Sequence, residues 1–205
     1  MTKNAFLPII AMTVAAVWAA PALADTLGDG TEIRAEDAVR LEMLNEFAGR
    51  AFRQALGGGS EPDVLALTQA MRGTPRDIDP GALVGDWSCQ MMKLGDISPL
   101  VVYSPFKCRI EKDGDKVLFR KLTGSQQTRG SLHPDGDRIV YLGTSYIQGD
   151  TPVDYADLPA NVDSASQPQR LPDVAVLESV SDNHARLIFP DPLLESDMNI
   201  LDLRR

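Results

Sequence analysis

The chain lacks any excess of positive charge, since 20 Lys and Arg residues face 29 Asp and Glu residues for a net charge of −9. Phosphate recognition normally needs a basic surface, so this balance argues against a nucleic-acid-binding protein. The sequence also lacks a Gly-x-Ser-x-Gly pentad, which excludes the nucleophile elbow of an α/β-hydrolase. Only two histidines and two cysteines are present, and neither histidine stands at a ligand spacing from a cysteine, which argues against a closed zinc site. We therefore expect neither a metal nor a cofactor.

The first 24 of the 205 residues resemble an export signal. Lys3 precedes an apolar stretch over residues 6–20, and Ala22-Leu23-Ala24 forms a small-x-small cleavage site. A membrane anchor is the alternative, but the stretch is short and acidic residues follow it directly. We predict cleavage after Ala24, a periplasmic or secreted location, and no transmembrane segment in the mature chain.

Export affects the interpretation of the two cysteines, Cys89 and Cys108. In an oxidising compartment an even pair indicates a disulfide, which would contribute about 3 kcal/mol across a loop of this length. Two free thiols or half of a metal site are the alternatives. Neither His133 nor His184 stands at a ligand spacing from a cysteine.

Residues 25–82 are predicted to form a polar leader and two helices. Apolar residues recur at three- and four-residue steps over residues 35–56, and the three glycines at 57–59 end that pattern. Ser60 can cap a shorter second helix that ends near Gly73. Such a helical hairpin is too small to bury a core alone, so we expect it to pack on the C-terminal part of the chain.

From residue 83 onward the hydrophobic period changes to two. Eight candidate strands follow: Leu83–Met92, Leu100–Glu111, Lys116–Leu122, Gln127–Leu132, Arg138–Tyr146, Val174–Val180, Ala185–Phe189 and Met198–Leu203. Asp113-Gly114 and Asp135-Gly136 are strong hairpin turns. We predict a mainly β fold over residues 83–205, an antiparallel barrel of about eight strands. The proline-rich segment 148–173 is expected to be a long loop.

The cysteines suggest a register for the first two strands. If Cys89 lies opposite Cys108, Trp87 faces Ile110 and Met91 faces Phe106. All these side chains then share one apolar face of the sheet.

Two arrangements could carry catalytic or metal chemistry. Ser125, His133 and Asp135 could form a triad, but His133 belongs to a turn sequence that would leave its imidazole in solvent. Acidic pairs at Asp113/Asp115 and Asp135/Asp137 flank the hairpin glycines, where calcium binding and ordinary turn chemistry are both possible. Turn chemistry alone explains them.

The most unusual polar stretch is residues 124–130, which could form a recognition site. A bulged strand with polar residues in water is the alternative. Tyrosines could line a barrel mouth or simply pack in the core. The candidate ligand-binding residues are Trp87, Tyr103, Ser125, Gln126, Arg129, Tyr141 and Tyr146.

The triplet Gly85-Asp86-Trp87 resembles the signature of the lipocalin superfamily. The resemblance implies that Trp87 closes the bottom of a barrel and that an arginine near the chain end packs across it. Arg204 or Arg205 could take that part.

Several separated blocks resemble an exported bacterial family, the domain of unknown function 4893. The blocks are Gly85–Cys89, Leu100–Tyr103, Phe106–Ile110, Lys121–Gln126, Tyr141–Gly143 and Glu195-Ser196. This resemblance spans roughly residue 35 to the C-terminus and implies a signal peptide, paired cysteines and a single domain. Gln127 departs from the family pattern, in which a basic residue is expected.

These observations favour a non-enzymatic binding protein, with a small apolar or amphipathic ligand at the open end of the barrel. An envelope protein–protein interaction module with a packed barrel is the second hypothesis. A hydrolase acting on envelope polymers is the third, and it rests only on the compartment and the many carboxylates. The hollow barrel predicts a cavity, whereas an enzyme predicts titratable residues converging in a cleft.

Overall fold

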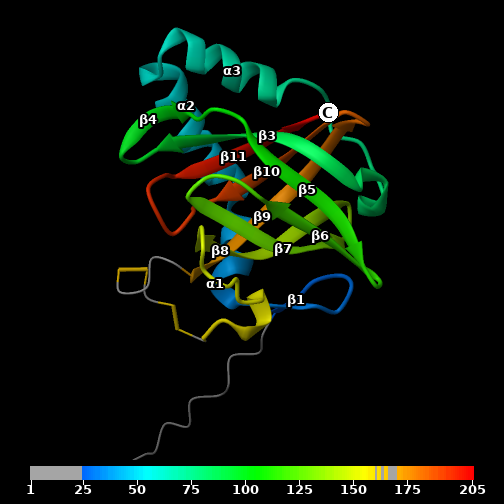
Figure 1. The fold of residues 1–205 in the computed structure, drawn as a ribbon. Helices are drawn as coiled ribbons and strands as arrows, with labels where there is room; N and C mark the ends of the chain where they lie inside the picture. Colours follow the sequence, from blue (N-terminus) through cyan, green and yellow to red (C-terminus); the bar gives the residue numbers. More distant parts are fainter. Residues whose placement is uncertain (1–24, 160, 163, 166–169) are drawn as a thin grey trace, which may run out of the picture.

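A computed structural model describes residues 25–159, 161–162, 164–165 and 170–205. The predicted signal segment and part of the long loop lie outside these residues. Eight antiparallel strands form a closed up-and-down barrel, in which the last strand pairs with the first (Figure 1). The mainly β, eight-stranded barrel predicted from the sequence is therefore confirmed.

The barrel strands follow one another along the chain, and one extra strand lies beside the first of them. Their bounds are β3 Gly85–Gly95, β4 Ser98–Val102, β5 Phe106–Asp113, β6 Lys116–Lys121, β7 Gln126–Asp135, β8 Arg138–Ile147, β9 Arg170–Ser181, β10 His184–Pro190 and β11 Met198–Arg204. β4 is the extra strand and pairs with the end of β3. Gly114 and Gly136 have φ of 60° and 64°, as two-residue hairpin turns require.

One predicted strand is wrong, because residues 100–111 form two strands and not one. β4 and β5 both pair with β3, and Tyr103, Ser104 and Pro105 separate them. Proline has no N–H to donate to a strand ladder, which accounts for a break at this point. β9 also begins at Arg170, so the final residues of the predicted loop 148–173 belong to the barrel wall.

Three helices precede the barrel in the chain, α1 Ala35–Glu42, α2 Leu44–Gly58 and α3 Glu61–Met71. The single helix predicted over residues 35–56 is broken at Met43. α1 contacts β9, whereas α2 contacts β3 and β4 (Figure 1), so the break lets each half lie against a different part of the barrel. Ser60 caps α3 as predicted, accepting a hydrogen bond from the Asp63 N–H.

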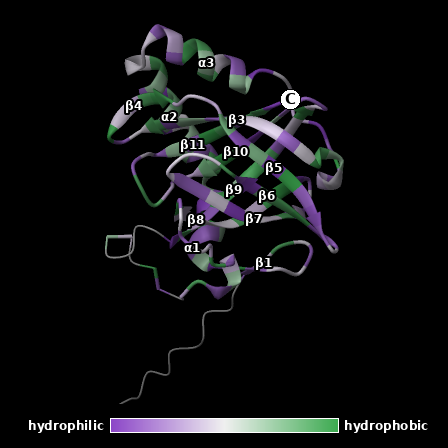
Figure 2. Cartoon of the chain, viewed as in Figure 1, coloured by the Kyte–Doolittle hydropathy of each residue, from purple (hydrophilic) through white to green (hydrophobic). Residues whose placement is uncertain are grey.

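Shorter elements complete the fold. β1 (Asp25–Thr26) pairs with β2 (Glu32–Ile33), the 3₁₀ turn η1 (Pro80–Leu83) leads into the barrel, and η2 (Tyr155–Asp157) interrupts the long loop. Along the barrel strands hydrophobic residues alternate with hydrophilic ones (Figure 2). One main cluster of buried apolar side chains fills the barrel interior, and a second lies between β3 and the helices.

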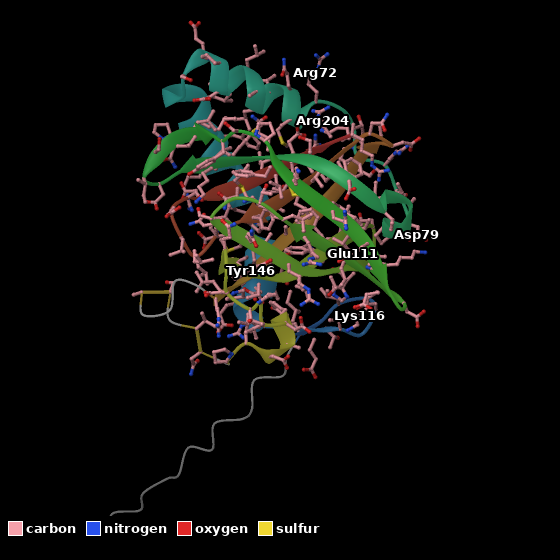
Figure 3. The ribbon with its side chains drawn as sticks, in the orientation of Figure 1. Arg72, Asp79, Glu111, Lys116, Tyr146 and Arg204 are labelled. Atoms are coloured by element: carbon pink, nitrogen blue, oxygen red, sulfur yellow. A yellow bond between two sulfur atoms is a disulfide. The ribbon has the colours of Figure 1, made fainter. Side chains whose placement is uncertain are left out.

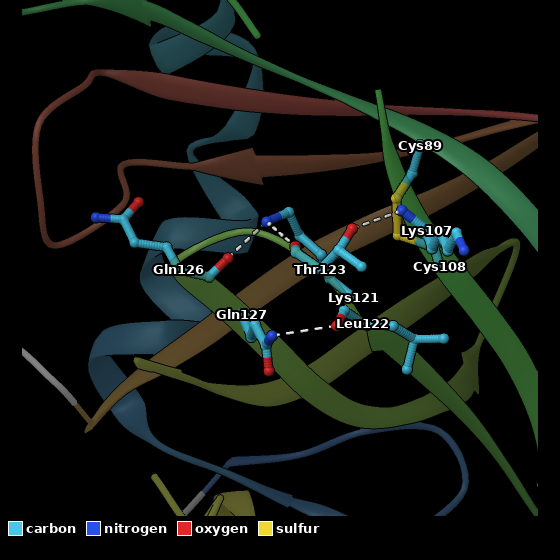
Figure 4. The surroundings of a disulfide bond; sticks show 8 residues. All are labelled: Cys89, Lys107, Cys108, Lys121, Leu122, Thr123, Gln126 and Gln127. Atoms are coloured by element: carbon cyan, nitrogen blue, oxygen red, sulfur yellow. Dashed lines mark hydrogen bonds between the residues drawn. A yellow bond between two sulfur atoms is a disulfide. The ribbon is translucent and has the colours of Figure 1, made fainter. Parts of the chain in front are cut away.

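The disulfide between Cys89 and Cys108 is present, but the register predicted for it is wrong. Cys108 lies opposite Trp87, and Cys89 lies opposite Phe106, so the bridge crosses diagonally between β3 and β5 (Figure 4). A shift of two residues keeps every side chain on its face, which is why hydrophobicity alone could not distinguish the two registers.

Within the described residues, none of the helices is both long and apolar enough to cross a bilayer.

Candidate functional site

One end of the barrel interior is polar. On β3 and β6, the inward-facing residues change from apolar to polar along the strand. Along β3, Trp87 and Cys89 belong to the apolar core, whereas Lys93 lines a cavity further along the same face. On β6, Phe119 belongs to the core, and Lys121, two residues later, lines the same cavity. Side chains two apart share a strand face, so both lysines continue the inward rows.

The other side of the barrel repeats the pattern. β9 places Ala175 in the core and Asp173 in the cavity, and β11 places Leu201 in the core and Asn199 in the cavity. Because neighbouring strands are antiparallel, these inward polar residues come from opposite strand ends and still gather at one end of the barrel. We call this end the mouth; it is the left end in Figures 1 and 3, near the label Tyr146.

The mouth cavity has a volume of about 90 Å³. Its wall is partly apolar, with side chains from four strands and the loop between β10 and β11: Met91, Tyr146, Leu171, Phe189, Leu193 and Leu194. Its polar side chains include Lys93, Lys121, Gln126, Thr128, Asp173 and Asn199. Apolar walls with a few convergent polar groups are typical of small-molecule sites.

Asp173 is the carboxylate of this cavity. It lies opposite Gly143 on β8, where the missing side chain leaves room for the Tyr141 hydroxyl, which hydrogen-bonds Thr128 at 2.7 Å. Within the described chain no Lys, Arg or His nitrogen lies within 4 Å of the carboxylate. Burial raises the pKa of Asp173 to about 6, although the hydroxyl of Thr128 and the charge of Arg40 oppose that shift.

Lys121 is the more deeply buried of the two cavity lysines, with 4% of its surface exposed. Its Nζ donates to the Thr123 carbonyl at 2.9 Å and to the Gln126 carbonyl at 2.5 Å (Figure 4), and lies 3.8 Å from the centre of the Phe106 ring. No carboxylate of the described chain lies within 4 Å of it. Burial, and then the charge of Lys93, lower the pKa of Lys121 to about 8.

The charge of the second cavity lysine, Lys93, is compensated by a neighbouring carboxylate. Its ammonium pairs with Glu195 from the loop between β10 and β11 and donates to the Gln126 side chain at 3.0 Å. The hydrogen bond from Lys93 lowers the pKa of Glu195. Among the described residues, the mouth therefore holds a lysine that is paired with a carboxylate, an ammonium with no carboxylate within 4 Å, and a carboxylate with no cation within 4 Å.

A buried ion pair on α1 supports the wall beside Asp173. Asp37 and Arg40 pair at 2.9 Å, and Arg40 also donates to the backbone carbonyls of Asp191 and Pro172 at 3.2 and 3.4 Å. Tyr155 of the long loop donates to Asp37 at 2.5 Å. Removing either partner of such a pair would leave an uncompensated buried charge, so the pair fixes α1, the loop and the mouth relative to one another.

The opposite end of the barrel is closed by Trp87. Its indole N–H donates to the Leu83 carbonyl at 2.9 Å, and the Arg205 guanidinium lies 3.9 Å from the ring centre. Arg205 also donates to the Leu83 carbonyl at 2.5 Å. This is the arrangement that the lipocalin resemblance implies, with Arg205 in the role left open between the two terminal arginines.

The structure separates the seven residues predicted to bind a ligand. Gln126 and Tyr146 line the mouth cavity. Tyr103 is 38% exposed beside Lys93, and Arg129 faces outward and pairs with Asp154 at 3.3 Å. The remaining three do not line this cavity: Ser125 is exposed on the β6–β7 turn, and Trp87 and Tyr141 lie in the core. Whether any of the seven contacts a ligand stays a prediction.

The histidines correct another expectation, since both are buried. His133 forms no triad with Ser125 and Asp135; its Nε2 lies 2.7 Å from the Ser131 hydroxyl and its Nδ1 lies 2.8 Å from Asp29. Ser131, His133 and Asp29 follow one another like the groups of a catalytic triad, but Ser131 lies within a central strand and does not line the mouth cavity. We interpret it as a contact that holds the β1–β2 hairpin on the barrel.

His184 is held in a similar way. Its Nε2 lies 2.8 Å from Asp202, which also pairs with Arg204 at 2.9 Å. Burial, partly offset by the charge of Asp202, lowers the pKa of His184. Within the described chain no group of three or more His, Cys, Asp or Glu side chains could hold a metal ion.

Sequence reasoning missed Lys93, Lys121 and Asp173. The first two continue the alternation of apolar residues that marks the inward face, so a charged residue in phase with the core was the available signal. Asp173 is the last residue of the predicted loop 148–173, directly before a predicted strand. Its position becomes visible only when β9 extends back to Arg170.

No curated protein and no solved structure gave a significant match to the chain. The model of the domain of unknown function DUF4893 matches residues 31–203, which include α1 to α3 and all of the barrel except its last residue, Arg204. The chain therefore belongs to the DUF4893 family.

Proposed function

We propose that this protein is a non-enzymatic binding protein that holds a small amphipathic ligand in the mouth of its barrel. The observation that carries the proposal is the switch of the inward rows from apolar to polar at one end only. Buried charges destabilise a fold unless they are paired. Cores normally exclude them, so a layer of charged groups facing a cavity favours a binding role.

The cavity size limits what can enter. At about 90 Å³ it accommodates a small molecule or the polar end of a longer one, whose remainder would lie against the leucines of the β10–β11 loop. This supports the hollow-mouth hypothesis over a fully packed barrel acting through its outer surface.

We also propose that the chain is exported and that the predicted cleavage after Ala24 takes place. The disulfide supports an oxidising compartment, because such bridges are rare where thiols are kept reduced.

Native mass spectrometry of the protein purified from periplasm tests both parts. We expect a chain that begins at Asp25, lacks two hydrogens at the cysteines, and carries an extra mass that leaves on denaturation. Ser145→Phe, which fills the cavity wall, should abolish that extra mass, whereas Ser88→Phe on the exposed outer face of β3 should retain it. A bare mass for the unmodified protein and both variants would contradict the binding proposal.

A further inference from the structure

The two uncompensated charges of the mouth have opposite signs. Asp173 has no cation within 4 Å and Lys121 has no carboxylate within 4 Å, although both line the same cavity in the described chain. They are too far apart to pair with each other. Each charge is therefore partly desolvated without a partner that would offset the cost.

The nearby groups do not supply those partners. The carbonyls of Thr123 and Gln126 accept two of the three N–H bonds of Lys121 but carry no net charge. Glu195 is engaged by Lys93, and Arg40, whose charge acts on Asp173, is engaged by Asp37. What the cavity lacks is one positive and one negative group held within a single small volume.

We propose that the ligand is a small zwitterion, an amino-acid-like molecule with its ammonium at Asp173 and its acidic group at Lys121. This inference rests on the proposed function, since it assigns the ligand class of the same cavity. A ligand with only a cation would meet Lys121 uncompensated, and one with only an anion would meet Asp173. A zwitterion compensates both, and charged hydrogen bonds are the strongest that such a site can form.

Apolar walls add a further preference. Phe189, Leu171 and Met91 contact the same space, so a zwitterion with an aliphatic side chain buries apolar surface that glycine cannot. The neutral hydroxyls and amides of the wall fix orientation without adding net charge.

The test uses matched molecules that differ only in charge. Calorimetric titration of the full mature protein with leucine, isopentylamine and 4-methylpentanoate compares the zwitterion with its cation-only and anion-only analogues. Alanine, ethylamine and propanoate repeat the comparison on a shorter frame. We expect a zwitterion to bind at least about tenfold more tightly than either matched ion at pH 7.

Two variants locate the charges. Asp173→Asn keeps the shape and should lower affinity for the zwitterion about tenfold while leaving affinity for the anion-only analogue unchanged or higher. Lys121→Met should do the converse for the cation-only analogue. Asp113→Asn and Lys116→Met, at the exposed β5–β6 hairpin, are the matched controls, and circular dichroism confirms that each variant is folded.

Equal binding of a zwitterion and either of its matched ions would overturn the inference, as would no binding of any of the six. Asp173→Asn alone can also overturn it, by leaving the zwitterion's affinity unchanged. These failures differ from failure of the proposed function, because a native mass that Ser145→Phe removes would still show an occupied mouth with a ligand of another class.

Discussion

At the closed end of the barrel, Trp87 lies between the Leu83 carbonyl and the Arg205 guanidinium, and the charged group stays at the surface. At the mouth, the same eight strands turn Lys121 and Asp173 inward. At the closed end the indole N–H and the guanidinium both have partners, whereas among the described residues of the mouth Lys121 and Asp173 have no opposite charge within 4 Å. We therefore expect the closed end to contribute more to stability than the mouth, which holds the charged groups assigned above to the proposed ligand.

The middle of the barrel separates these two ends. The Cys89–Cys108 bridge, Phe119 and Tyr141 form a layer with the Tyr141 hydroxyl directed at Thr128, so polar contacts begin within one residue of the core. Burial raises the pKa of that hydroxyl, which stays a neutral hydrogen-bonding group. The transition from core to cavity is thus abrupt.

The largest expected effect is at the closed end. Trp87→Ala should lower the free energy of unfolding by about 3–5 kcal/mol, because it removes a buried aromatic ring and leaves a cavity. Urea denaturation followed by circular dichroism measures this. Tyr103→Ala, at a side chain that is 38% exposed near the mouth, should cost less than about 1 kcal/mol. Similar losses for the two variants would remove the energetic difference between the ends.

Reduction of the disulfide tests whether the middle layer of the barrel contributes to stability as the closed end does. Reduction should cost about 3 kcal/mol, since the bridge closes a loop over a sequence separation of 19 residues. For a chain of this size, the loss corresponds to a fall in melting temperature of about 6–12 °C, measurable by calorimetry with and without reductant. The Cys89→Ala/Cys108→Ala variant should show the lower value in both conditions. An unchanged melting temperature on reduction would show that the bridge contributes nothing to stability.

The buried carboxyl group of the mouth should make the stability of the protein depend on pH. Asp173 has a folded-state pKa of about 6, above its value of about 3.9 in an unfolded chain, so the folded state binds more protons between these values. Stability should therefore fall as pH rises from about 4 to about 6, and the loss stays in full at pH 7. Because the carboxyl faces an open cavity, we expect a loss on the order of 1 kcal/mol.

Asp173→Asn isolates that contribution. The variant should be more stable than the unmodified protein at pH 7, by an amount that vanishes near pH 4. Denaturant titrations of both proteins at pH 4, 5, 6 and 7 give the difference directly, with Asp113→Asn as a surface control. A difference that does not change with pH would mean that Asp173 titrates normally and that the mouth does not disfavour its charge.

The fold could be predicted largely because its signals are local. Asp113-Gly114 and Asp135-Gly136 specify hairpins without reference to the rest of the chain, and alternation marks each strand. The register of β3 against β5 could not be predicted, since a two-residue slip preserves the faces. The break at Met43 also has no local signal and follows from the different strands that α1 and α2 contact.

The candidate site is harder to predict from the sequence than the fold, because its residues come from distant parts of the chain and carry no local signal. Lys121 and Asp173 lie 52 positions apart in the chain, and only barrel closure places them in one cavity. The sequence predicts Gln126 because it belongs to the polar stretch 124–130, and Tyr146 because it is a tyrosine on a predicted strand. The residues that distinguish the mouth chemically were single charged positions within apolar rows, where a lone lysine in a strand is easily interpreted as solvent-facing.

The smallest effect concerns the outer side of the closed end. Arg205→Ala should lower the free energy of unfolding by about 1 kcal/mol, because it removes one cation–π contact and one hydrogen bond to Leu83 while Trp87 stays in place. A chain that begins at Asp25 has Trp87 as its only tryptophan, so fluorescence reports this end alone. Arg204→Ala, which contacts Asp202 and not the indole, should leave the Trp87 emission unchanged. If both variants shift that emission equally, Arg205 has no specific role in closing the barrel. The two ends would then differ only in the side chains buried there, apolar at one end and charged at the other.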